Sequence, residues 1–134
     1  MSRKTIRENV FKLAYETVIC GEVNDLTVEM VTQNIDQLDK AYFDEVFFGV
    51  VNKKVKLTEI IKKYARSYEF DRLYKVDIAI LFVAIYEILY VQDIPHKVSA
   101  NEAVELAKAY STEKSASYIN GILASVIKSV EDNK

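Results

Sequence analysis

The chain has 134 residues, of which half are hydrophobic, and its formal net charge is −2. A chain of this length typically forms one domain and buries about two-thirds of its unfolded surface, so it needs no metal or disulfide to fold. Cys20 is the single cysteine, which excludes an internal disulfide. Three glycines and one proline are too few for the many turns of an all-β protein. The composition therefore predicts one all-α domain over residues 1–134.

Two segments of the sequence indicate the expected cellular location of the protein. Residues 1–10 are polar and basic, without the apolar stretch that a signal peptide needs after them. The longest apolar run, residues 76–91, is short for a membrane span and contains Asp77 and Glu87, which would be costly in lipid. We therefore expect a cytoplasmic protein in which this run is a buried central helix.

The hydrophobic periodicity predicts about seven helices and no strand. In chain order they cover residues 4–20, 28–34, 36–53, 58–67, 73–92, 99–110 and 114–130. Gly21 is expected to end the first helix. Ser99 and Glu102 have the spacing of a capping box for the sixth helix. Gly121, inside the seventh, is expected to let a neighbouring helix approach closely.

A seam near residues 55–57 divides these helices into an N-terminal half, about 1–55, and a C-terminal half, about 56–134. Charge is segregated between the segments: residues 21–50 contain seven acids and one lysine, whereas residues 51–75 contain eight bases and three acids. The lysines at 53–63 form either an ordinary solvated helix face or a binding surface.

No catalytic constellation is visible. His96 is the only histidine, so neither a serine triad nor a paired-histidine metal site can form, and no glycine-rich phosphate loop is present. Cys20 lies in an apolar stretch without a partner that would activate its thiol. We expect neither enzymatic activity nor a metal or cofactor.

Three blocks of sequence carry a resemblance to a known family. Residues 72–123 contain RLYKVDIAIL, AIYE, DIPHKVSANEAVELAK and YINGIL in order. Tyr42-Phe43 is followed by Gly49-Val50 in the third helix. Arg3-Lys4-x-x-Arg7-Glu8 precedes Leu13-x-Tyr15 in the first. The order, spacing and residue types resemble the NusB family of bacterial transcription antitermination factors.

The resemblance implies an all-α fold of two small helical bundles packed side by side. It also implies an adaptor that binds the single-stranded boxA element of ribosomal RNA leaders together with the ribosomal protein NusE. Such a complex acts indirectly on RNA polymerase by helping it to read through terminators.

The family's site residues carry over to six positions of this sequence. RNA binding is implied for Arg3, Lys4, Arg7, Tyr15 and Asp77, and partner binding for Tyr118. The first three would contact phosphates, and Tyr15 could stack on a base. Asp77 also fits a first-turn acid that stabilises the helix dipole, and Tyr118 also fits core packing.

Ile78 and Phe82 stand where the family often has cations. Extra apolar surface there could serve a protein contact, and we expect weak RNA binding without a protein partner. Two alternatives stay open. One is a helical protein–protein module or homodimer with little RNA binding of its own. The other is a detached relative of the NusB-like domain of ribosomal RNA cytosine methyltransferases.

Overall fold

The computed structural model describes residues 2–65 and 69–133. Within these ranges it contains seven α-helices, one short 3-10 helix and no β-strand, which confirms the all-α prediction. The elements are α1 (Arg3–Cys20), α2 (Asp25–Thr32), α3 (Gln37–Asn52), α4 (Lys54–Tyr64), the 3-10 helix η1 (Phe70–Arg72), α5 (Lys75–Tyr90), α6 (His96–Tyr110) and α7 (Glu113–Asp132).

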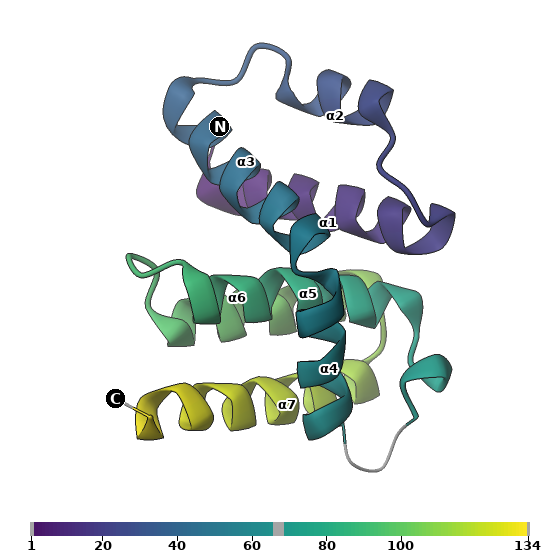
Figure 1. Ribbon diagram of the computed structural model, residues 1–134, viewed down its shortest axis with the longest axis vertical. Coiled ribbons are helices and arrows are strands. Elements are labelled where there is room, and N and C mark those ends of the chain that lie inside the picture. Colours follow the sequence, from purple (N-terminus) through teal and green to yellow (C-terminus); the bar gives the residue numbers. More distant parts are fainter. Residues whose placement is uncertain (1, 66–68, 134) are drawn as a thin grey trace.

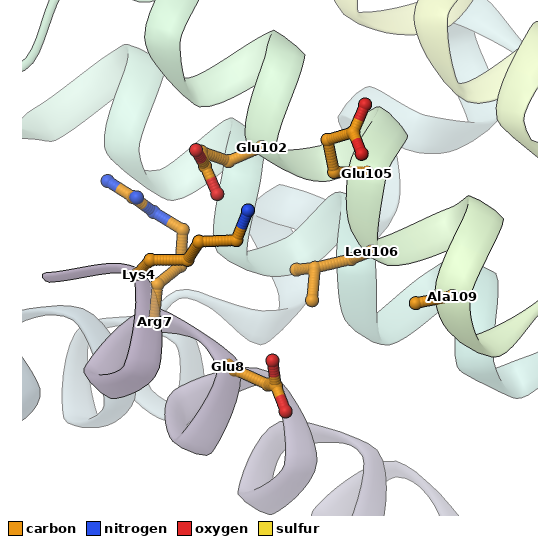
Figure 2. Close-up of a pocket in the computed structure, with 7 residues that line it drawn as sticks. All are labelled: Lys4, Arg7, Glu8, Glu102, Glu105, Leu106 and Ala109. Carbon is orange, nitrogen blue, oxygen red and sulfur yellow. The ribbon is translucent and has the colours of Figure 1, made fainter. Parts of the chain in front are cut away.

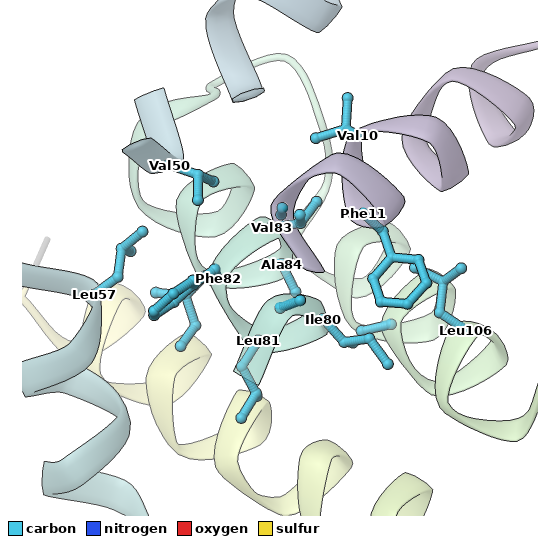
Figure 3. Packing of buried hydrophobic residues seen from close by; sticks show 14 of the residues in the cluster. Val10, Phe11, Val50, Leu57, Ile80, Leu81, Phe82, Val83, Ala84 and Leu106 are labelled. Carbon is cyan, nitrogen blue, oxygen red and sulfur yellow. The ribbon is translucent and has the colours of Figure 1, made fainter. Parts of the chain in front are cut away.

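The helices form two groups around a central one. In Figure 1, α1, α2 and α3 occupy the upper half and α4, α6 and α7 surround α5 in the lower half. Eleven of the sixteen residues of α5 are buried, because α1, α3, α4, α6 and α7 all pack against it. Figure 3 shows Phe11 of α1 and Leu106 of α6 close to Ile80 of α5. One continuous apolar cluster therefore joins both halves of the chain.

The start of α6 differs from the predicted one. The helix begins at His96, directly after Pro95, so Ser99 lies in its first turn and not at its N-cap. Ser99 Oγ donates a 2.7 Å hydrogen bond to Glu87 Oε1 in the core. The capping-box prediction is wrong, because the Ser99 hydroxyl binds Glu87 in the core. Pro95 is tolerated at the N-cap because the helix does not use the N–H that proline lacks.

The boundaries of two other helices also shift. The second helix begins at Asp25, because the side chain of Asn24 caps it by accepting from the backbone N–H groups of Leu26 and Thr27. The fourth begins at Lys54, so residues 55–57 at the predicted seam already lie within a helix. Its predicted end at residue 67 lies outside the described residues.

Two of the three glycines have a structural role, one as a helix cap and one at a close contact between helices. Gly21 ends α1 with φ of +83°, as predicted. Gly121 does not mediate a close approach: a Cβ there would meet no atom within 4 Å. The close approach is at Gly49, where an added Cβ would overlap the ring of Tyr86. Gly49 thus lets α3 lie directly against α5.

None of the described helices is both long enough and apolar enough to cross a membrane.

Candidate functional site

A buried polar network joins four helices at Glu87 of α5, which is fully buried. Arg7 of α1 donates from Nε to Oε2 over 2.8 Å and from Nη2 to Oε1 over 3.2 Å. Tyr42 of α3 donates its hydroxyl to Oε2, and Ser99 of α6 donates to Oε1. Both carboxylate oxygens therefore accept two hydrogen bonds each, and the charge is balanced by the guanidinium.

The network explains the electrostatics of its members. Burial alone would lower the pKa of Arg7, but the hydrogen bond and charge of Glu87 outweigh it, so the pKa is raised. Burial, and then the charge of Glu87, raises the pKa of Tyr42. At neutral pH Arg7 is thus charged and Tyr42 keeps its proton. Arg7 is only 5% exposed, so this predicted phosphate contact lies in the core, facing a carboxylate.

Arg3 and Lys4 are exposed in the first turn of α1. The guanidinium carbon of Arg3 lies 4.2 Å from the ring centroid of Tyr42, within the range of a cation–π interaction. Figure 2 shows Lys4 directed into a cavity of about 140 Å³ between α1 and α6, which Glu102 and Glu105 also line. The predicted cations at the start of α1 are therefore on the surface, except Arg7.

Exposed aromatic rings continue this surface along α1. Tyr15 is 37% exposed and Tyr110, the last residue of α6, is 43% exposed. The buried ring of Phe11 lies between them, with centroid distances of 6.4 Å to Tyr15 and 5.2 Å to Tyr110. The amine of Lys12 lies 5.6 Å from the Tyr110 ring centroid. This arrangement places the exposed Tyr110 ring beside a cation and the exposed Tyr15 ring against the same buried phenylalanine.

A hydrogen bond orients Tyr110. Its hydroxyl donates to Glu8 Oε1 over 2.6 Å, and this bond, followed by that from Lys12, lowers the pKa of Glu8. Tyr110 and Lys12 could not be predicted from the sequence as part of one site, because they lie 98 positions apart. Neither residue has a local signal that distinguishes it from an ordinary surface residue.

Asp77, in the first turn of α5, lies beside Tyr118 of α7. Oδ2 of Asp77 accepts from Ser115 Oγ over 2.7 Å and from Tyr118 Oη over 2.6 Å. Oδ1 is buried and has no hydrogen-bond partner in the described structure. Tyr118 is half-buried and, with Lys114 and Tyr74, lines a cavity of about 170 Å³. Asp77, predicted to bind RNA, and Tyr118, predicted to bind the partner, are thus joined by a hydrogen bond.

Ile78 and Phe82 do not provide an apolar surface. They are 5% and 2% exposed, and together with Val18 and Phe70 they line a cavity at the junction of α1, α4 and η1. The expectation of an exposed apolar contact there is wrong, because neighbouring helices cover both side chains.

The alternative basic surface lies on α4. Its lysines at 54, 56, 62 and 63 are all exposed, as is Lys53 directly before it. Lys56 and Lys63 border a groove between α4 and α7 that Ile60 and Val126 also line. Among the described residues, no group of three or more His, Cys, Asp or Glu side chains is placed to hold a metal ion.

Comparison with known proteins places this geometry in a family. The NusB family model matches residues 4–128. The transcription antitermination protein NusB of Finegoldia magna is 41% identical, with 98% of each chain covered. T. maritima NusB has a TM-score of 0.87 at 29% identity, covering 96% of this chain and 92% of that one. The antitermination factors NusB and NusE in complex with double-stranded RNA provide a further match, with a TM-score of 0.83 at 24% identity and coverage of 95% and 96%, which shows the shared fold.

Proposed function

This chain belongs to the NusB family, and on that premise we propose that it binds single-stranded boxA-type RNA together with ribosomal protein NusE as a transcription antitermination adaptor. Its relatives are named antitermination proteins, and a solved relative of the same fold is in complex with NusE and double-stranded RNA. The observation that carries the proposal is the surface of α1, where exposed cations adjoin exposed tyrosine rings.

That surface has the two chemistries that single-stranded RNA requires. Arg3 and Lys4 offer charge to phosphates, which positions the strand without reading its sequence. Tyr15 and Tyr110 offer ring faces on which unpaired bases stack. Lys12 lies on α1 between the Arg3–Lys4 pair and Tyr15, where it can contact a phosphate of the strand that joins them. We name these five residues the α1 surface.

The net charge of −2 predicts little sequence-independent attraction to RNA, so a second protein is needed for strong binding. Tyr118 is the proposed anchor for that partner, because it is an aromatic side chain at the edge of a cavity. Asp77 fixes the Tyr118 hydroxyl through its Oδ2 atom and thereby orients the ring. A basic ribosomal protein would complement the acidic segment at residues 21–50, which speeds and orients association.

Titration of labelled boxA-type RNA, with and without NusE, tests the proposal. Neutralising Arg3 and Lys4 together should weaken binding and flatten the log–log salt dependence by roughly 0.7 per lost phosphate contact. Lys62→Ala with Lys63→Ala on α4 is the matched control, since it removes the same charge from another exposed face. A salt slope that changes only in the α4 variant would move the RNA site to that helix.

One observation favours the protein–protein alternative. Leu26 and Met30, one turn apart on α2, are 71% and 73% exposed within the acidic segment. If this face mediates self-association, sedimentation would show a concentration-dependent dimer that Met30→Lys abolishes. A monomer at all concentrations that binds RNA in the presence of NusE excludes this alternative.

A further inference from the structure

We infer that Tyr42 is a positioning residue for Arg3: its ring, tied to buried Glu87, is the platform that holds the Arg3 guanidinium toward RNA. The inference rests on the proposed function. It assigns a role in RNA binding to a core residue of α3, and that role extends through Tyr42 to the buried ion pair behind it.

The geometry places Tyr42 between the core and the α1 surface. Its side chain is 6% exposed, and its hydroxyl donates to Glu87 at the inner end. The ring lies beneath Arg3, at 4.2 Å from the guanidinium carbon, and Arg7 is 5.7 Å from the same centroid. Arg3 itself is exposed. One ring thus contacts the buried arginine and the exposed one.

The anchor at Glu87 makes the platform rigid. A tyrosine ring held only by packing can tilt, but here the hydroxyl is fixed to a carboxylate that Arg7 and Ser99 also hold. Three helices, α1, α5 and α6, therefore determine where the ring of a fourth, α3, lies.

A fixed platform matters because a free arginine loses much rotamer freedom when it binds a phosphate. A guanidinium already resting on a ring has given up part of that freedom before RNA arrives. Its N–H donors at the edge of the plane stay available for a phosphate. Lys4, the next residue, contacts no aromatic ring among the described residues and serves as the internal comparison.

A double-mutant cycle separates positioning from a purely structural role. Binding of labelled boxA-type RNA is measured at saturating NusE for Tyr42→Leu, Arg3→Ala and the double variant. Tyr42→Leu should weaken binding about threefold to tenfold when Arg3 is present, a range set by the strength of cation–π contacts, and less than about twofold in Arg3→Ala. In a Lys4→Ala background the full loss should persist.

Equal losses with and without Arg3 would overturn the inference, because they mean that Tyr42 acts only through the fold. An Arg3→Ala variant that binds as well as the wild type would also overturn it, while RNA binding itself stands. No RNA binding by the wild type with NusE would instead overturn the proposed function. If Tyr42→Leu does not fold, as judged by circular dichroism, Tyr42→Phe completes the cycle: it keeps the ring, loses the anchor and should show a smaller loss that again disappears in Arg3→Ala.

Discussion

Arg7 and Glu87 are 80 residues apart in the sequence, yet the guanidinium of one binds both carboxylate oxygens of the other in the core. The two side chains are 6% and 0% exposed. The pair ties α1 to the central helix and, through Tyr42 and Ser99, ties α3 and α6 to the same carboxylate. The orientation of α1, which carries the proposed RNA surface, therefore depends on this pair.

Removing the charge of Glu87 should destabilise the protein severely. Glu87→Gln leaves the Arg7 guanidinium buried without a counter-charge, and broken buried ion pairs cost about 3–5 kcal/mol. Urea denaturation followed by circular dichroism measures the change. Glu105→Gln is the matched control, because that acid is exposed and only weakly paired with Lys108, at 3.9 Å. A loss below about 1 kcal/mol in Glu87→Gln would show that the pair does not hold the helices together.

The hydroxyl of Tyr42 should make stability depend on alkaline pH. Because the folded pKa is raised above the ordinary 10.0, above about pH 10 the unfolded chain loses a proton that the folded chain keeps. The contribution of this hydroxyl to the free energy of unfolding is therefore fully present below pH 10. Above pH 10 it falls by up to about 1.4 kcal/mol per pH unit. Tyr42→Phe, about 1–3 kcal/mol less stable at neutral pH, should approach the wild type as pH rises. A constant difference between pH 8 and 11 would contradict this.

Alanine should have opposite effects at two helical glycines. At Gly49 the new methyl would overlap the ring of Tyr86, and such overpacking costs about 1–3 kcal/mol. At Gly121 nothing lies within 4 Å, so the higher helix propensity of alanine should stabilise by up to about 1 kcal/mol. Thermal unfolding of both variants gives the comparison. Tyr86→Leu should relieve the defect of Gly49→Ala; equal effects of alanine at both glycines would show that α3 does not press on α5 there.

Truncation of the central helix tests the hydrophobic core. Ile80 is fully buried, so Ile80→Ala should cost about 2–5 kcal/mol. Leu26→Ala provides the control, since its side chain is 71% exposed and its loss should change stability by less than about 0.5 kcal/mol. The free energy of unfolding in urea measures both. Similar values for the two variants would mean that α5 is not the centre of the fold.

Tyr118 should matter more for the partner than for the fold. Tyr118→Ala should weaken NusE binding by more than about 1 kcal/mol in isothermal titration, since an aromatic anchor is removed. Val55→Ala on α4, where the side chain is 75% exposed, should leave the affinity unchanged. Full affinity in Tyr118→Ala would place the partner site elsewhere.

The helices and their central member were predictable because they depend on local pattern. Apolar positions that recur every three or four residues indicate a helix wherever it packs, and a segment apolar on every side, as α5 is, must be surrounded. The cap at Gly21 is equally local, since a positive φ favours glycine. The family motifs likewise indicated Arg3, Lys4 and Tyr15, which are exposed on α1 as a surface site requires.

The roles of particular polar side chains were decided by the tertiary structure. Ser99 fits a helix cap in the sequence and Arg7 fits a phosphate contact, yet both bind Glu87 because packing brings α1 and α6 to the same face of α5. Gly49 and Gly121 look alike in the sequence, and only the position of Tyr86 separates them. A hydrogen bond or a steric contact acts over a few ångströms, so it depends on which helices meet, whereas helix formation depends on neighbours three and four residues away.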